Sequence, residues 1–146
     1  MTTLCVVCNK LFDKKVTKGY NLVPNVCSGD CFHTMIIGEQ KFPLETMDGI
    51  KFLPTDSVDY KSDYEIKFME WAKKRKLKPI YEPFLFTFGK FKGYIPDFLV
   101  NGSVIVETKG LWMNGAYPKV SGLRDYLKLI VPVYVVNADL LRRILK

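Results

Sequence analysis

The chain has 146 residues, of which 48% are hydrophobic and 25% are charged, so it is long and apolar enough to bury a core and is not a disordered tail. The longest apolar run, residues 129–136, is too short to span a bilayer, and the N-terminus lacks the charged start and apolar stretch of a secretory signal. We therefore expect a cytoplasmic protein that has no membrane partner.

The excess of positive charge lies in the second part of the chain. Lys and Arg number 22 against 15 Asp and Glu, and after residue 60 basic side chains outnumber acidic ones two to one. A polyanionic partner accounts for such an excess, with DNA or RNA as the first candidate. A surface charge that only keeps the protein in solution accounts for it equally well.

Four cysteines form two close pairs near the N-terminus, Cys5 with Cys8 and Cys27 with Cys31. Zn²⁺ prefers four thiolates in a tetrahedron, and two short-spaced pairs supply them with little strain in the chain. Because four thiolates leave no open position for water, the pattern predicts a structural zinc module over residues 1–40.

The sequence around the cysteines agrees with a zinc finger. Asn9-Lys10 predicts a tight turn after the first pair, and Ser28 is placed to cap a short helix over residues 30–37. Two disulfides or four unrelated thiols are the alternatives, which the expected compartment and the regular pairing disfavour. The single histidine, His33, could replace a cysteine as ligand, but we expect it on the helix surface.

Residues 41–60 contain Pro43, Gly49 and Pro54 without sustained periodicity, which predicts a linker with one short strand over residues 50–53. From Ser62 the pattern becomes that of a mixed α/β domain over residues 61–146. The predicted elements are a helix from Ser62 that ends before Pro79, strands over 80–88, 94–100 and 104–109, a helix over 119–129, a strand over 131–136, and a helix over 138–145 capped by Asn137.

The hairpin formed by residues 94–100 and 104–109 carries three charges in otherwise apolar strands, at Asp97, Glu107 and Lys109. If the loop has three residues, Asp97 faces Glu107, and Lys109 shares the face of Glu107 because side chains alternate. A two-residue turn would move Glu107 to the other face, so the arrangement requires the longer loop or a bulge.

Two carboxylates that face each other across a hairpin repel one another unless a cation lies between them. Mg²⁺ or Mn²⁺ takes oxygen ligands and keeps waters for chemistry, and Lys109 could orient such a water or stabilise developing charge. The pattern indicates metal-assisted hydrolysis of phosphodiester bonds. A salt bridge between Lys109 and the two acids is the alternative, although charges are costly in apolar strands that have no function.

Pro96-Asp97 and Glu107-Thr108-Lys109 resemble the two halves of the motif of the PD-(D/E)XK nuclease superfamily. Residues 94–112 further resemble the active-site hairpin of the phage endonuclease I family, which resolves Holliday junctions. The run from Ser62 to Glu82 is also similar, since an acidic residue opens a helix and a Tyr-Glu pair starts the next strand. The resemblance covers roughly residues 62–112, excludes the finger and the linker, and implies a restriction-endonuclease-like α-β-β-β-α-β core.

The resemblance implies a role for each matching residue. Asp97, Glu107 and the Thr108 backbone carbonyl would bind the catalytic Mg²⁺, and Lys109 would lie beside the attacking water. Glu65 matches a helix glutamate that completes a second metal site, but its place in a Ser-x-x-Glu capping box leaves a purely structural role open. The family also implies a homodimer that recognises branched DNA by shape, in a bacterial host cell if the gene belongs to a phage.

Basic side chains of the second domain are candidate contacts to DNA phosphates, which position the protein without reading bases. For the cluster at the helix end, solvated cations that complement the helix dipole are the alternative. The candidates are Lys73, Lys74, Arg75, Lys76, Lys78, Lys90, Lys92, Lys119 and Arg124.

The sequence thus predicts a Mg²⁺-dependent endodeoxyribonuclease that acts on branched DNA and resolves Holliday junctions. One alternative keeps the chemistry and changes the substrate, as in a free-standing phage or mobile-element (homing-type) endonuclease that prefers a site on duplex DNA. A second alternative is a non-catalytic, zinc-containing nucleic-acid-binding protein.

Overall fold

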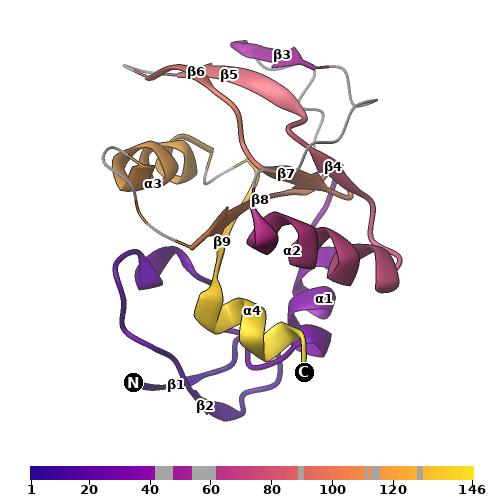
Figure 1. Cartoon of the computed structure of the whole chain (residues 1–146), viewed down its shortest axis with the longest axis vertical. Coiled ribbons are helices and arrows are strands. Elements are labelled where there is room, and N and C mark those ends of the chain that lie inside the picture. The colour runs from indigo at the N-terminus through magenta and orange to yellow at the C-terminus, as the bar shows by residue number, and fades with distance from the viewer. Residues whose placement is uncertain (42–47, 54–61, 89–90, 111, 113–115, 128–129) are drawn as a thin grey trace.

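The computed structural model describes residues 1–41, 48–53, 62–88, 91–110, 112, 116–127 and 130–146. Within these ranges the chain forms three β-sheets and four α-helices, which confirms the predicted mixed α/β class (Figure 1). No helix in the described ranges is both long enough and apolar enough to cross a membrane.

The N-terminal part contains an antiparallel ribbon followed by one short 3₁₀ helix and one α-helix. Its elements are β1 (Thr2–Leu4), β2 (Leu11–Asp13), the 3₁₀ helix η1 (Tyr20–Leu22) and α1 (Gly29–Ile37). The turn predicted at Asn9 is confirmed, since its N–H donates to the Cys5 carbonyl at 3.0 Å and its φ is 63°. The predicted cap of α1 is confirmed too, because Ser28 Oγ accepts from the Cys31 N–H at 3.2 Å.

A four-stranded mixed sheet forms the centre of the second part, in the order β4-β7-β8-β9. Its strands are β4 (Pro79–Tyr81), β7 (Phe98–Val100), β8 (Val104–Lys109) and β9 (Val133–Asn137). The first three pair antiparallel, and β9 runs parallel to β8. Three helices, α2 (Asp63–Lys74), α3 (Ala116–Leu127) and α4 (Ala138–Ile144), pack on this sheet, with α2 against β4 and β8 and the other two against β9.

The helix and strand ends follow local signals that were read from the sequence. Ser62 Oγ accepts from the Glu65 N–H at 3.3 Å and starts α2, while Asn137 Oδ1 accepts from the Leu140 N–H at 2.9 Å and starts α4. The helix expected over residues 119–129 begins earlier, at Ala116, and residues 128–129 lie outside the described residues. The strand expected over residues 131–136 is shifted by two residues at its start.

A second sheet of three strands contains β3 (Ile50–Phe52), β5 (Phe84–Phe88) and β6 (Phe91–Tyr94). The short strand predicted within residues 50–53 is confirmed as β3, which pairs with β5. The parts of the predicted linker that fall on residues 42–47 and 54–60 lie outside the described residues.

Two of the predicted strands are wrong as single strands. The strand expected over 80–88 divides into β4 and β5, which belong to different sheets, because Glu82 adopts a φ of 45° and Pro83 has no N–H to donate. The strand expected over 94–100 divides into β6 and β7 around Pro96 for the same reason. Both breaks let the chain leave one sheet and enter the other.

The register of the β7–β8 hairpin is the one that the sequence argument required. Val100 pairs with Val104, and Phe98 pairs with Val106, so the loop contains three residues. The left-handed φ values of Asn101 and Gly102, 56° and 63°, make this tight connection. The prediction of a three-residue loop is therefore confirmed.

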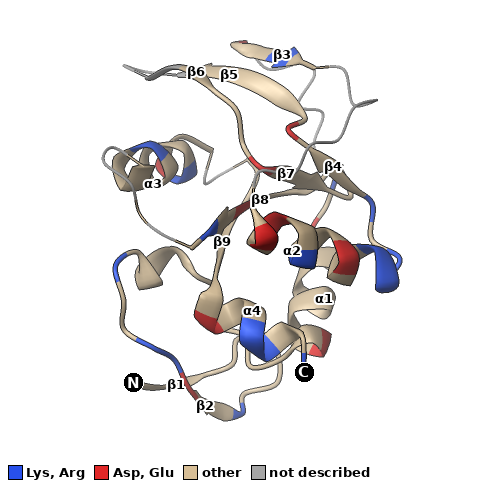
Figure 2. Cartoon of the chain, viewed as in Figure 1, with Lys and Arg blue, Asp and Glu red and all other residues tan. Residues whose placement is uncertain are grey.

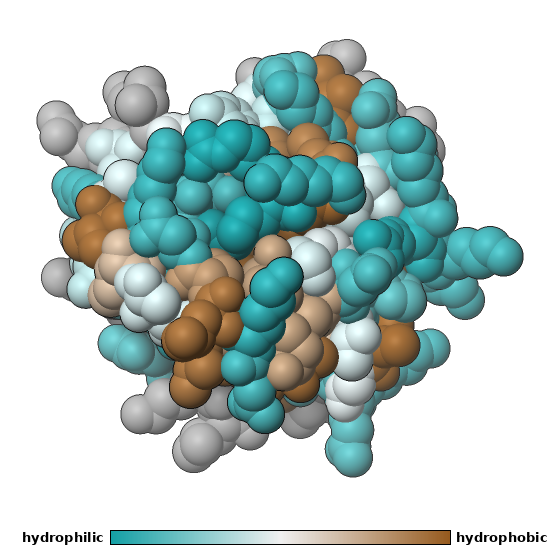
Figure 3. Space-filling view, turned by 90° about the horizontal axis from the view of Figure 1, so that it is seen from below, coloured by the Kyte–Doolittle hydropathy of each residue, from teal (hydrophilic) through white to brown (hydrophobic). Residues whose placement is uncertain are grey.

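The finger and the second part of the chain share one hydrophobic core. Phe32 of α1 stacks on Trp71 of α2, with ring centroids 5.4 Å apart, and Asp30 forms an ion pair with Arg75 at 2.5 Å. The finger is thus packed against the sheet domain. Figure 3, which views the molecule from the finger side, shows a hydrophilic surface interrupted by apolar groups.

Candidate functional site

The four cysteine sulfurs lie together, as the spacing predicted. All four Sγ atoms fall within 4.8 Å of one another, with Cys8 3.6 Å and Cys31 3.8 Å from Cys27, and all four thiols are free. Thiolates at about 2.3 Å from a tetrahedral zinc ion lie about 3.8 Å apart, so this cluster is compatible with a structural zinc site. His33 is half-buried on α1 and is not a member of the cluster.

The hairpin brings Asp97 and Glu107 into contact through the backbone. The N–H of Asp97 donates to Glu107 Oε1 at 2.9 Å. In the other direction, Asp97 Oδ2 accepts from the Thr108 N–H at 2.8 Å and from the Thr108 hydroxyl at 3.0 Å. Each carboxylate thus binds the opposite arm of the hairpin just where regular pairing ends before Phe98.

Both carboxylates are poorly solvated, which disfavours their charged forms. Burial and the neighbouring Asp97 raise the pKa of Glu107 to about 8, although Lys109 lowers it. Burial also raises the pKa of Asp97, against the opposing hydrogen bond from the Thr108 amide and the charge of Lys109. Two carboxyl groups held this way favour a bound cation or a shared proton.

Lys109 lies on the side of β8 that carries Glu107, with Nζ 3.7 Å from Glu107 Oε2. The lysine side chain is 23% exposed whereas that of Glu107 is 2% exposed, so the amine can reach solvent and the acid cannot. The salt bridge that was considered between Lys109 and both acids is therefore found to Glu107.

Glu65 is buried in the first turn of α2 and faces the same region. Its Oε2 accepts from the Tyr81 hydroxyl at 2.7 Å, and its charge contributes to the raised pKa of Asp97. Among the described residues, only the four cysteines form a group of three or more potential metal ligands. Glu65, Asp97 and Glu107 therefore do not converge as closely as the thiols do.

The sequence argument missed the side chain of Thr108 and considered only its backbone carbonyl. Strict alternation along β8 places Thr108 on the face opposite to Glu107. Asp97, however, precedes the first residue of β7 and is not bound by that alternation, so its carboxylate reaches the Thr108 hydroxyl. The hydroxyl of Thr108, which lies in the sequence between the charged residues Glu107 and Lys109, was the signal that could have indicated this role.

The basic candidates differ in how exposed they are. Figure 2 shows Lys and Arg residues gathered at the end of α2 and present on α3. Lys73, Lys74, Lys76 and Lys78 are exposed at and beyond the end of α2. Arg75 is half-buried between Asp30 and the Trp71 ring, 5.7 Å from the ring centroid, so it joins the finger to α2.

The remaining basic candidates lie around α3 and β6. Lys119 is exposed, and Arg124 donates to the Asn21 carbonyl of the finger at 3.0 Å. Lys90 and the side chain of Lys92 lie outside the described residues.

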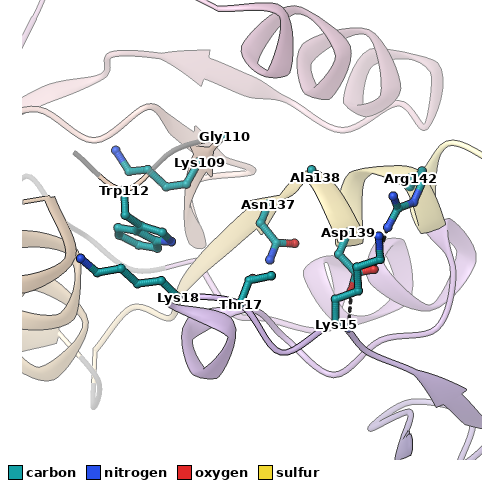
Figure 4. Close-up of a pocket in the computed structure, with 10 residues that line it drawn as sticks. All are labelled: Lys15, Thr17, Lys18, Lys109, Gly110, Trp112, Asn137, Ala138, Asp139 and Arg142. Atoms are coloured by element: carbon teal, nitrogen blue, oxygen red, sulfur yellow. Dashed lines mark hydrogen bonds and ion pairs between the residues drawn. The ribbon is translucent and has the colours of Figure 1, made fainter. Parts of the chain in front are cut away.

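Two cavities meet at Lys109. One, of about 310 Å³, is also lined by Tyr94 and Lys119. The other, of about 420 Å³, lies between the end of β8, the finger and the start of α4 (Figure 4). The motif lysine is therefore placed between two solvent-accessible hollows that carry further cations.

Comparison with protein-family models, with curated proteins and with solved structures finds no match for this chain.

Proposed function

We propose that this protein is a Mg²⁺-dependent DNA endonuclease of the PD-(D/E)XK type. The observation that carries the proposal is the placement of Asp97, Glu107 and Lys109 at one end of the β7–β8 hairpin, beside two cavities. The order α2, β4, β7, β8, α3, β9 supports the proposed α-β-β-β-α-β core, with β5 and β6 as an addition between its first two strands.

The residues present fit a hard divalent ion. Asp97 and Glu107 are carboxylates that burial and mutual repulsion hold in a strained electrostatic state, which a cation relieves. The hydrogen bonds above use Asp97 Oδ2 and Glu107 Oε1, and they fix both side chains before any ion binds. Asp97, Glu107 and the Thr108 carbonyl would hold Mg²⁺, with Glu65 as a candidate for a second ion.

The bound ion would activate water and polarise a phosphodiester. The protein's own residues supply the rest. Thr108 orients the Asp97 carboxylate through two hydrogen bonds, and Glu107 holds the Asp97 backbone in place. The amine of Lys109, whose side chain is partly exposed, holds positive charge where the anionic substrate approaches.

Branched DNA is the substrate that we propose, cut by a homodimer whose two sites act on opposite strands. The test compares a four-way junction with a linear duplex of matched sequence, in Mg²⁺ and in Ca²⁺. Ca²⁺ replaces EDTA as the inactive condition because a chelator would also remove zinc. We expect Mg²⁺-dependent cleavage that favours the junction and is lost in Asp97→Asn, while the exposed Asp125→Asn control on α3 cuts normally.

Each other outcome of this assay contradicts part of the proposal. Cleavage at one site of the linear duplex would contradict the junction substrate and indicate an endonuclease that prefers a site on duplex DNA. Binding without cleavage in any divalent ion would replace the enzyme with a nucleic-acid-binding protein. A sedimentation measurement that finds only a monomer on DNA would contradict the homodimer.

We also propose that the cysteine cluster holds one structural zinc ion per chain. Elemental analysis of the purified protein should give one zinc, and Cys8→Ser should lower both zinc content and thermal stability. His33→Ala is the matched control, since His33 lies on α1 outside the cluster, and it should retain the full zinc content. Wild-type protein that is folded without zinc would contradict the assignment.

A further inference from the structure

The larger of the two cavities at Lys109 is basic, and two of its cations come from the finger. Lys15 and Lys18 line it from the finger, Lys109 from the end of β8, and Arg142 from α4 (Figure 4). Among the described residues that line the cavity, Asp139 is the one carboxylate. The finger thus contributes half of the positive charge around a hollow that begins at the motif lysine.

The charge of Asp139 is already engaged. Its carboxylate accepts from the Lys15 backbone N–H at 3.1 Å, from Arg142 at 3.0 Å and from Arg143. In the part of the chain that the structure describes, no hydrogen bond or ion pair engages the Lys15 or Lys18 amines, and both side chains are exposed. The two amines therefore remain available to an anion.

The shape of the cavity is fixed by close contacts between the finger and the hairpin end. Gly19 packs so closely on Trp112 that a Cβ there would lie 2.6 Å from the indole Nε1. Trp112 in turn packs edge-on against Tyr117 of α3, with ring centroids 5.4 Å apart. The indole, the finger lysines and Lys109 all line this cavity, so its described lining is basic and includes one aromatic ring.

We propose that this cavity binds a backbone phosphate of the nucleic-acid strand that enters the active site, so that the zinc finger is part of the substrate-binding surface. The inference rests on the proposed nuclease function and adds Lys15 and Lys18 to the substrate contacts. Lysine amines are point donors suited to phosphate. Because Lys109 also lines the cavity, we assign the phosphate to the strand bound at the active site and not to free phosphate.

The test measures binding without cleavage. Full-length, zinc-loaded protein is titrated with a fluorescent four-way junction in Ca²⁺, at several salt concentrations. The variant Lys15→Gln/Lys18→Gln keeps side-chain length and removes two charges. Its control, Lys10→Gln/Lys51→Gln, removes two exposed charges that do not line the cavity. Zinc content and melting temperature confirm that each variant is folded.

We expect the cavity variant to bind about ten-fold more weakly and its salt slope to fall by about 0.9, since one phosphate contact is lost. The control should change affinity less than about two-fold, as sequence-independent charge alone predicts. Equal losses in the two variants would overturn the cavity assignment and leave the nuclease proposal intact. Wild-type protein that binds no nucleic acid would overturn both.

A second arm separates a strand phosphate from a free one. Inorganic phosphate is titrated into the same protein by calorimetry and then added as a competitor to the junction titration. We expect only weak binding of phosphate by itself. Micromolar binding of inorganic phosphate that is lost in the cavity variant would overturn the assignment to a nucleic-acid strand.

Discussion

The N–H of Asp97 donates to Oε1 of Glu107 at 2.9 Å, so the Glu107 side chain on β8 holds the backbone of the other arm of the hairpin. Pro96 precedes Asp97 and carries no N–H, so regular pairing with β8 ends here. The side chains of Asp97 and Glu107 take over the backbone bonding and are brought together as a result. A structural irregularity thus builds the candidate site.

Glu107→Gln should stabilise the metal-free protein while it abolishes cleavage. The amide keeps the acceptor for the Asp97 N–H and removes the free-energy cost of burying beside Asp97 an ionisable carboxyl whose own pKa is raised to about 8. We expect a gain of about 1–2 kcal/mol in the free energy of unfolding, as is common when a strained functional charge is removed. Urea unfolding of the zinc-loaded protein without Mg²⁺ measures it, and a loss of stability would contradict the account.

Thr108→Val should slow cleavage by about ten-fold, because it removes the hydroxyl that bonds to Asp97 Oδ2 and retains the shape of the side chain. Thr108 acts here as a positioning residue. Thr108→Ser, which keeps the hydroxyl, should retain most of the rate. If Thr108 had only a structural role, Thr108→Val would lower the rate less than Thr108→Ser, because Val packs better. Single-turnover cleavage rates and the Mg²⁺ concentration for half-maximal rate are the measurements.

Gly19→Ala should destabilise the protein more than Gly102→Ala does. Both glycines have positive φ, 79° and 63°, so both substitutions carry the backbone cost of about 1 kcal/mol. A Cβ at Gly102 meets nothing closer than 4.0 Å, whereas one at Gly19 overlaps the Trp112 ring and adds about 1–3 kcal/mol. Equal melting temperatures for the two variants would show that the finger is not pressed against Trp112.

Asp139→Asn should cost about 1–3 kcal/mol near neutral pH and less in acid. Burial raises the pKa of Asp139, but hydrogen bonds from the Lys15 amide, Arg143 and Arg142 outweigh it and leave the pKa below its ordinary value of 3.8. The ionised carboxylate therefore stabilises the fold above that value, and this contribution is lost as the pH falls through the lowered pKa. The cations that face it are Arg142, Arg143 and the buried Lys14, none of which titrates in this range.

Urea unfolding of wild type and Asp139→Asn from pH 6 to about pH 3 tests this sign, because all other carboxylates titrate alike in both proteins. The difference in unfolding free energy between the two proteins should be constant near pH 6 and should shrink as the pH approaches about 3. A difference that grows in acid would contradict the assigned direction of the shift.

Local signals in the sequence predicted where three of the helices begin and the register of the central hairpin. Ser28, Ser62 and Asn137 each cap the helix that they were expected to cap, and the loop at Asn101 has the three residues that the charge pattern required. These features depend on a few neighbouring residues, so the sequence alone is sufficient to find them.

Features that depend on contacts between distant segments were not predictable. The change of sheet at Glu82 was missed within a run of aromatic residues. Pro83 could have indicated a break, but the φ of 45° at Glu82 depends on the two sheets that it joins. Likewise the stacking of Phe32 on Trp71, which fixes the finger to α2, joins residues that no local pattern relates. The Thr108 hydroxyl was missed because Asp97 precedes β7, so its side chain does not follow the alternation expected for a strand.

Metal binding by the hairpin itself is the most direct test of the account. Mn²⁺ is titrated by calorimetry into zinc-loaded protein and into Asp97→Asn/Glu107→Gln, without DNA, so that catalysis plays no part. The account predicts one Mn²⁺ per chain in the wild type beyond the zinc, and no binding in the double variant, with equal zinc in both. Identical Mn²⁺ binding by the two proteins, or none by the wild type, would contradict it.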